Sequence, residues 1–135
     1  MVEIRPAIPE DIPELIELRH ERALLQRQRI APNVRELWSS ELDGWLKDVD
    51  GVAYVAVSNG QIVGYILGRV QSEQRKGVIS ELVLDLHQYQ GGAGRLLVDV
   101  LHQWFRDCNI EQVVVSVHPR LPVEQAFWRA LGAVK

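Results

Sequence analysis

Residues 81–105 read ELVLDLHQYQGGAGRLLVDVLHQWF, and this stretch decides the fold. An apolar run from Glu81 to Leu86 comes first, and glycines follow at positions 91, 92 and 94. Beyond the last glycine, large apolar residues recur at the spacing of one helix face: Leu96, Leu97, Val100, Leu101, Trp104 and Phe105. The stretch therefore predicts a strand, a glycine-rich turn and a helix.

The turn has the composition of an anion site. Glycine has no Cβ, so its backbone can approach a ligand closely. The first amides of a helix have no partner within the helix and lie at its positive end. Together these features favour a phosphate or pyrophosphate. The alternative is a tight connection without a ligand, since neither the P-loop sequence nor the dinucleotide-binding glycine spacing is present.

The turn resembles motif A of the GCN5-related N-acetyltransferase (GNAT) family, in which Arg/Gln-x-x-Gly-x-Gly/Ala follows a strand that commonly ends Val-Asp-Pro. Leu84-Asp85-Leu86 stands at the strand end, and Gly92 and Gly94 match the two spaced glycines. An ungapped match puts Tyr89 at the first motif position. A one-residue deletion before Gly92 instead keeps Tyr89-Gln90-Gly91 as the family's Tyr-Arg/Gln-Gly, and both alignments stay open.

Residues 126–133, AFWRALGA, resemble motif B of the same family, Phe-Tyr-x-x-x-Gly-Phe. Trp128 stands where the family has its Tyr, Leu121 where an Asn is common, and Ala133 where the second Phe belongs. An indole N–H cannot act as the acid that the phenol provides. Three readings follow: the thiolate leaves unaided, Tyr89 or His118 serves instead, or the domain binds coenzyme A with little catalysis.

The resemblance implies that the amides of residues 90–95 hold the pyrophosphate of acetyl-CoA, the co-substrate. The residues that it assigns to the coenzyme are Leu84, Asp85, Leu86, Gln90, Gly91, Gly92, Ala93, Gly94, Arg95 and Trp128. A backbone N–H near Leu84 would polarise the thioester oxygen. Asp85 also has a structural interpretation, because it lies next to the turn.

Glu81 is the best candidate for the base that removes the proton of an attacking amine. It lies on the strand before the turn, where the family often has a Glu or a water-holding residue. A carboxylate half-buried among apolar neighbours would be a stronger base. The alternative is a strand Glu that faces solvent. Tyr89 is the second catalytic candidate.

The rest of the chain predicts an α/β (α+β) fold like that of the family. Strands are expected over residues 2–7, 51–58, 61–70, 78–86 and 112–117, and helices over 9–25, 34–46, 95–105 and 123–131. Asn59-Gly60 predicts a two-residue hairpin, and Asn33 with Glu36 predicts a capping box. A helix between two strands favours a parallel pair. We therefore expect one domain, residues 1–135, with a mixed, mostly antiparallel twisted sheet flanked by helices.

Trp38 and Trp45 lie in the region that borders the acceptor in the family, and both have core packing as the alternative. The chain also stops soon after motif B, where the family continues into further strands. We therefore expect a shortened C-terminus: either the chain is truncated, or a second copy covers the open sheet edge in a homodimer.

The composition limits the classes of binding partner and the compartment that we expect. A net charge of -3 implies no general attraction to nucleic acid or anionic membrane. The sequence has no apolar run long enough to cross a bilayer and no signal peptide. The single cysteine, Cys108, fits a reducing, cytoplasmic compartment. The four histidines lack metal-ligand spacing, so no metal is expected.

Three functions follow from these observations. The first is transfer of an acetyl group from acetyl-CoA to an amine of a small molecule, peptide or protein. The second is a non-catalytic acyl-CoA-binding or regulatory module. The third is an unrelated small α/β nucleotide binder.

Overall fold

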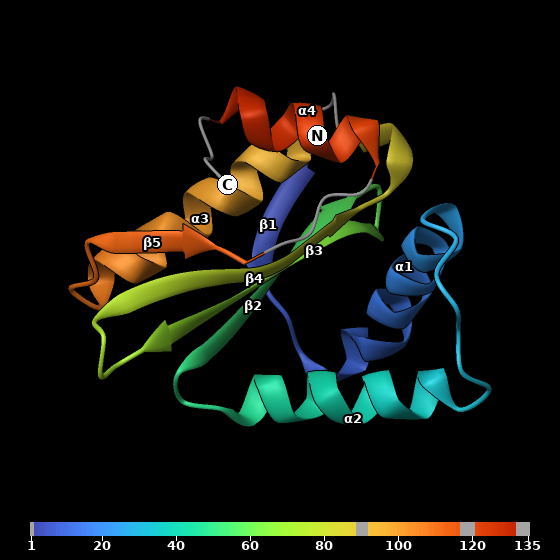
Figure 1. Ribbon diagram of the computed structural model, residues 1–135, viewed down its shortest axis with the longest axis horizontal. Coiled ribbons are helices and arrows are strands. Elements are labelled where there is room, and N and C mark those ends of the chain that lie inside the picture. Colours follow the sequence, from blue (N-terminus) through green and yellow to red (C-terminus); the bar gives the residue numbers. More distant parts are fainter. Residues whose placement is uncertain (1, 89–91, 117–120, 132–135) are drawn as a thin grey trace.

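The computed structural model describes residues 2–88, 92–116 and 121–131 (Figure 1). Its five strands are β1 (Val2–Pro6), β2 (Gly51–Ser58), β3 (Gln61–Gln71), β4 (Lys76–Leu84) and β5 (Gln112–Val115). Its helices are α1 (Ile12–Leu25), α2 (Val34–Lys47), α3 (Ala93–Asp107) and α4 (Pro122–Ala130), with 3₁₀ turns at Pro9–Asp11 and Leu86–Gln88. The strands follow chain order in one sheet, and only the β4–β5 pair is parallel. The predicted mixed, mostly antiparallel fold is confirmed.

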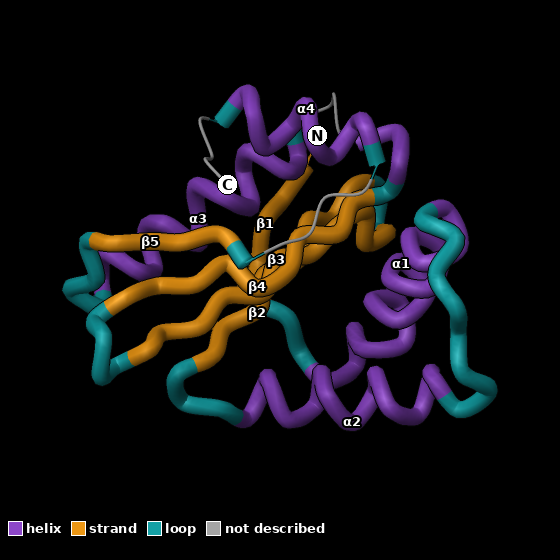
Figure 2. The backbone as a smooth tube through the Cα atoms, in the orientation of Figure 1, coloured by secondary structure: helices purple, strands orange, loops and turns teal. Residues whose placement is uncertain are grey.

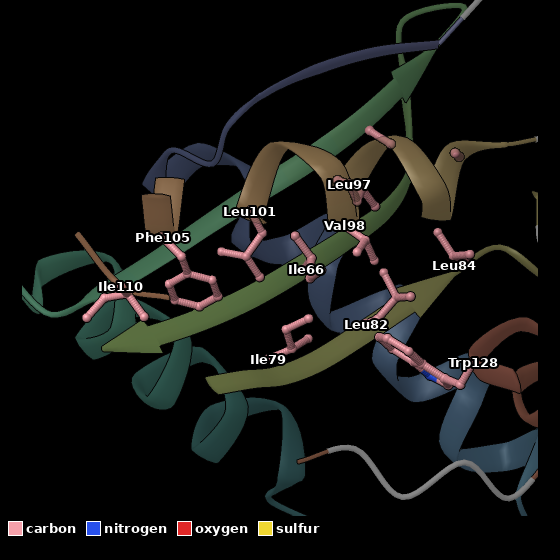
Figure 3. Close-up of a cluster of buried hydrophobic side chains, with 12 residues drawn as sticks. Ile66, Ile79, Leu82, Leu84, Leu97, Val98, Leu101, Phe105, Ile110 and Trp128 are labelled. Carbon is pink, nitrogen blue, oxygen red and sulfur yellow. The ribbon is translucent and has the colours of Figure 1, made fainter. Parts of the chain in front are cut away.

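The helices cover the two faces of the sheet separately. α3 and α4 lie on one face, and α1 and α2 lie on the other (Figure 2). Each face has its own cluster of buried hydrophobic residues. We call the one beneath α3, which includes Ile66, Leu82 and Leu97, the α3 cluster. The α3 cluster is drawn in Figure 3, where Leu97, Leu101 and Phe105 point onto the strands.

The β2–β3 hairpin closes as the sequence predicts. Asn59 and Gly60 have φ angles of +52° and +77°. Positive φ at both central residues is the type I′ geometry, whose twist matches that of the flanking strands. This turn sets the register in which β2 and β3 begin to pair.

β4 carries a bulge at Ser80. Leu67 of β3 pairs with Glu81, but the next residue, Gly68, pairs with Ile79, so Ser80 is the extra residue. A bulge reverses which face the following side chains occupy. Ile79 accordingly belongs to the α3 cluster, and Glu81 lies on the α1 face opposite Leu67.

The bulge also marks where β4 and β5 part. Parallel pairing runs from Lys76 with Gln112 to Ile79 with Val115 and stops there. Among the described residues, no strand pairs with β4 between Ser80 and Leu84 on that edge. Within the described part of the chain, the last five residues of β4 therefore have no strand beside them on this edge, which we call the open edge of β4.

Three local predictions are corrected. The buried stripe of α3 is Ala93, Gly94, Leu97, Val98, Leu101 and Phe105, whereas Leu96 is 42% exposed. Asn33 is the N-cap of α2, but its side chain makes no cap hydrogen bond, so the capping box is wrong. β4 begins two residues earlier than expected and ends at Leu84, and the structure gives β5 as Gln112–Val115.

Candidate coenzyme and acceptor site

The head of α3 presents amides without acceptors. Gly92 is the N-cap, with a φ of +86° that side-chain-bearing residues rarely adopt. A Cβ at Gly92 would meet nothing within 4 Å, so its surroundings are open. No described residue accepts a hydrogen bond from the amides of Ala93, Gly94 or Arg95. These amides lie at the positive end of a 15-residue helix, which suits an anion.

Gly94 is needed for packing rather than for ligand approach. A Cβ there would lie 2.8 Å from the ring of Phe127 and 2.9 Å from Leu84. The absent side chain lets α3 fit between α4 and β4. Gly92 and Gly94 therefore match one motif for two different physical reasons.

The other predicted turn residues fall into three groups. Asp85 shapes the turn: its carboxylate accepts the His87 N–H at 3.1 Å, and its carbonyl accepts the Gln88 N–H at 2.8 Å. Leu86 begins the 3₁₀ turn, and the exposed Arg95 side chain lies 3.6 Å from Asp99. Tyr89, Gln90 and Gly91 lie outside the described residues.

The amide of Leu84 faces the open edge of β4. The Asp85 N–H donates to the Val63 carbonyl at 2.8 Å, so Asp85 faces β3. Backbone groups of an antiparallel ladder alternate between its two edges. Leu84 N–H therefore points away from β3, toward the edge where β4 and β5 have parted. The role of this N–H as the donor to a thioester oxygen stays a prediction.

Glu81 lies in a buried polar cluster on the α1 face. Arg19, only 6% exposed, donates to Glu81 Oε1 from Nη2 at 2.7 Å and from Nε at 3.1 Å. The Tyr65 hydroxyl donates to the same oxygen, and Arg19 Nε also reaches the Tyr65 oxygen at 3.1 Å. The apolar surroundings expected for Glu81 are therefore wrong: a guanidinium and a phenol hold it.

Electrostatics keep both Tyr65 and Arg19 protonated. Complete burial, and then the negative charge of Glu81, raise the pKa of Tyr65 well above its usual value, so the phenol stays protonated and donates. Burial alone would lower the pKa of Arg19. The neighbouring Tyr65, Glu81 and Glu41 outweigh that effect and raise it, so Arg19 remains a cation.

A cavity of about 250 Å³ opens beside this cluster. Its lining consists of Arg19, Arg22, Ala23, Gln26, Gln28, Trp38, Glu41 and Glu81. Trp38 lies at this cavity, with the Arg19 guanidinium 5.4 Å from its ring centroid. Trp45 is a packing residue instead, because its Nε1 donates to the carbonyls of Val52 and Gly68.

A larger hollow, of about 790 Å³, lies between α1 and α2. None of its described lining residues belongs to β4 or α3. The smaller cavity does contain a residue of β4, Glu81, so it is the better candidate for a reacting group.

Arg19 is the residue that sequence reasoning missed. The apolar stripe of α1 was expected at Ile12, Leu15, Ile16 and Ala23, and the structure buries all four. Arg19 occupies the same stripe, four residues before Ala23. A charged residue within an apolar stripe was the available signal, since such a residue is buried only when paired.

Trp128 is a core residue. It is 8% exposed and belongs to the α3 cluster with Leu82 and Leu84 (Figure 3). Its ring meets that of Phe127 edge-on, at 5.3 Å between centroids and 84° between planes. The assignment of Trp128 to the coenzyme stays a prediction.

α4 is tied to α1 across this side of the molecule. Glu124, 2% exposed, accepts hydrogen bonds from Arg22 Nε at 2.6 Å and from Gln26 Nε2 at 3.0 Å. Arg22 and Gln26 also line the 250 Å³ cavity. The ion pair thus connects the cavity wall to the helix that follows β5.

Residues 2–88, 92–116 and 121–131 lack two kinds of feature. No cluster of His, Cys, Asp and Glu there could hold a metal ion. No helix in those ranges has the length and hydropathy to cross a membrane.

Solved structures share this fold along nearly the whole chain. A predicted acetyltransferase from Clostridium acetobutylicum, solved with acetyl-CoA, is 16% identical with a TM-score of 0.81, covering 100% of this chain and 91% of that one. PaiA N-acetyltransferase from Thermoplasma acidophilum, in complex with coenzyme A, is 18% identical with a TM-score of 0.80, covering 97% and 88%. An aminoglycoside acetyltransferase from an uncultured soil metagenomic sample, in complex with sisomicin, is 20% identical with a TM-score of 0.76, covering 99% and 90%.

The sequence itself gives the family. No curated protein matches the chain significantly. The family model described as "Acetyltransferase (GNAT) family" matches residues 14–133, which include the polar cluster, the β4 bulge and the head of α3. The chain therefore belongs to the GNAT acetyltransferase family.

Proposed function

We propose that the protein transfers an acetyl group from acetyl-CoA directly to an amine. The observation that carries the proposal is a pair of neighbouring donor sets: the amides at the head of α3, which have no acceptor among the described residues, and the Leu84 N–H on the edge of β4 that faces away from β3. The two are close, because a Cβ at Gly94 of α3 would lie 2.9 Å from the Leu84 side chain. The first set suits the pyrophosphate. The second suits the oxygen on which charge develops. The family assignment and the neighbours solved with acetyl-CoA or coenzyme A support the choice of co-substrate.

The chemistry needs few side chains. The amine nitrogen attacks the thioester carbonyl carbon, the carbon–sulfur bond breaks, and the amine proton passes to a base directly or through water. Glu81 is the carboxylate carried by β4 itself, and it is our candidate for that base or for holding the water. In this proposal the thiolate leaves without a phenol, because Trp128 replaces the family's Tyr.

Compartment and assembly belong to the same proposal. The exposed, unpaired thiol of Cys108 suits the cytoplasm. Val114 and Val115 of β5 are each 37% exposed, and no described strand pairs with the outer edge of β5. A homodimer through that edge would cover it. The acceptor is a small-molecule or peptide amine.

Two observations favour a second function, an acyl-CoA-binding module without turnover. Oε1 of Glu81 is already engaged by Arg19 and Tyr65, and Trp128 offers no acid. Thiol release from acetyl-CoA over a panel of amines separates the two. Release with any amine supports the transferase, and tight binding without release from any of them supports the module.

The coenzyme site is tested by Gly92→Ala with Gly60→Ala as its matched control. Both glycines have positive φ and open surroundings, so either change strains the backbone by about 1–2 kcal/mol. Only Gly92 lies at the head of α3. We expect Gly92→Ala to weaken acetyl-CoA binding about tenfold, by misaligning charge-assisted hydrogen bonds. Calorimetry that gives equal affinities for the two variants would remove the pyrophosphate assignment.

A further inference from the structure

A third hollow, of about 820 Å³, lies at the end of the sheet away from the head of α3. The turn between β3 and β4 forms one side of it, and the connection from α3 to β5 forms the other, both at the left of Figure 1. Pairing of Lys76 with Gln112 holds the two sides together. The volume is in the range of small-molecule sites.

The hollow brings two arginines together, one from each side. Arg75 and Arg106 both line it, and no ion pair among the described residues includes either of them. Arg106 donates to a neutral amide, Gln103 Oε1, at 3.1 Å. Six other arginines do pair with a carboxylate. Arg75 and Arg106 thus keep their charge for a ligand, although the chain as a whole has a net charge of -3.

The lining as a whole is positive. Glu111 is the only acid among the described lining residues, which gives a net charge of +1 with the two arginines. The acids next to the hollow in the sequence, Glu73 and Asp107, are not part of the lining, and Asp107 accepts from Gln103 Nε2 at 2.9 Å instead. The charge of the lining therefore favours an anion.

The end of α3 would by itself repel an anion, because its last carbonyls carry partial negative charge. Those of residues 104–106 are occupied, since they accept hydrogen bonds from the N–H groups of residues 108–110. The carboxamides of Gln74, Asn109 and Gln112 add neutral donors to the lining. Guanidinium and amide donors around one hollow suit an anion with several acceptor oxygens.

We propose that this hollow binds a phosphate monoester of small-molecule size, held by Arg75 and Arg106 and distinct from the coenzyme. The planar guanidinium fork matches the spacing of phosphate oxygens. The volume exceeds that of a phosphate group, so the organic part fills the remainder beside Ile110. The 15 residues of α3 separate this hollow from the head of the helix by about 20 Å, so one phosphate group cannot reach both. The site does not depend on the proposed acetyl transfer.

Binding is tested on the full chain at pH 7.5 with glycerol 2-phosphate, which is mostly a dianion there because its second pKa is about 6. Glycerol is the neutral probe, and acetate is the singly charged one. The readout is the NMR signals of the Asn109 and Ile110 backbone N–H groups, which lie at the hollow and are hydrogen-bonded to α3. The Ala93 N–H reports separately on the head of α3.

We expect a saturable shift of Asn109 and Ile110 with glycerol 2-phosphate, binding at least about threefold weaker with acetate because of its smaller charge, and no shift with glycerol. Arg75→Gln and Arg106→Gln should each weaken phosphate binding about fivefold, as for exposed ion pairs. Glu111→Gln should strengthen it about threefold, because a like charge is removed.

The control is Arg27→Gln. Arg27 matches Arg75 in exposure, in its positive φ of +55° against +52°, and in having no ion pair among the described residues. It lies outside this hollow, so its replacement should leave the binding unchanged.

Three results would overturn the site: a shift that does not saturate, a shift confined to Ala93, or equal losses in Arg27→Gln and Arg75→Gln. Acetate binding as tight as that of glycerol 2-phosphate would overturn the preference for phosphate. A silent Ala93 beside saturable shifts of Asn109 and Ile110 would instead count against the pyrophosphate position of the proposed function and support this site.

Discussion

The two faces of the sheet are built in opposite ways. Every buried residue of the α3 cluster is apolar, and glycines on the strands let the helix approach closely. A Cβ at Gly68 would lie 2.5 Å from Leu101, and one at Gly77 would lie 2.7 Å from Phe105. The α1 face instead buries Arg19 and Tyr65 beside Glu81.

From this difference we infer that the α3 face mainly stabilises the fold and that the α1 face mainly serves the reaction. Close apolar packing stabilises a fold with little cost. A buried ion pair loses much of its Coulombic gain to desolvation, and apolar residues of similar volume often replace it without loss. The α1 face therefore carries charge where the fold does not need it, beside the open edge of β4.

Phe105→Ala should have the largest effect on stability. Phe105 is 1% exposed and fills the space above Gly77. We expect the free energy of unfolding to fall by about 3–5 kcal/mol, from lost burial and the cavity left behind. Chemical denaturation measures the change. Thiol release per folded molecule should stay at the wild-type level, and a selective loss of turnover would contradict the separation of the two faces.

On the α1 face, replacing one member of the polar cluster should destabilise the protein more than replacing three. Arg19→Met alone leaves Glu81 without its cation and should cost about 3 kcal/mol. The triple variant Arg19→Met, Tyr65→Phe, Glu81→Met removes the whole polar cluster and should be within about 1 kcal/mol of the wild type, or more stable. Denaturant midpoints test the pair, and the triple variant should not acetylate. A triple variant as unstable as the single one would mean that the cluster stabilises the fold.

A third ion pair gives a structural contrast to Arg19 and Glu81. Asp11, 5% exposed, accepts from Arg5 at 2.8 and 2.9 Å and from the Ile8 N–H at 2.9 Å, just before α1. The hydrogen bonds from Arg5 lower the pKa of Asp11, against the opposing effect of burial. A lowered native pKa stabilises the fold above the unfolded value near ~3.9 and loses this effect as the pH falls through the native value.

Asp11→Asn should therefore cost about 1–2 kcal/mol at pH 7, a modest figure because Arg5 is half-exposed. The cost should shrink below about pH 4, where Asp11 of the unfolded wild type begins to take up a proton, and disappear as the pH falls through the lower native pKa. Unfolding curves of both proteins at pH 7, 4 and 2.5 measure it. If the cost of Asp11→Asn did not change with pH, packing rather than charge would cause the loss of stability. As a control, acetyl-CoA binding at pH 7 should be the same in both proteins.

Local patterns were enough to predict most of the fold. The two strands predicted on either side of Asn59-Gly60, and the strand, turn and helix predicted over residues 81–105, agree with the structure to within a few residues. These signals are short-range, since a hairpin turn and a helix stripe depend on residues close in the chain.

The site was less accessible to sequence reasoning, because its contacts are long-range. Arg19 meets Glu81 across 62 positions and Tyr65 across 46, and no local period links them. The bulge at Ser80 depends on pairing with β3, so the strand sequence alone did not reveal it. Glu81 was found by its place before the turn, but its partners were not.

The smallest prediction concerns a position where sequence and structure disagree. Helical spacing put Leu96 in the buried stripe of α3 and left out Val98, whereas Leu96 is 42% exposed and Val98 is 4% exposed. The stripe was offset because two adjacent leucines, Leu96 and Leu97, both fit an apolar period, and only contact with the sheet selects one. Leu96→Ala should cost at most about 0.5 kcal/mol, and Val98→Ala about 2 kcal/mol, by denaturant unfolding. Equal costs would mean that α3 packs through a broader face than its contacts with the sheet indicate.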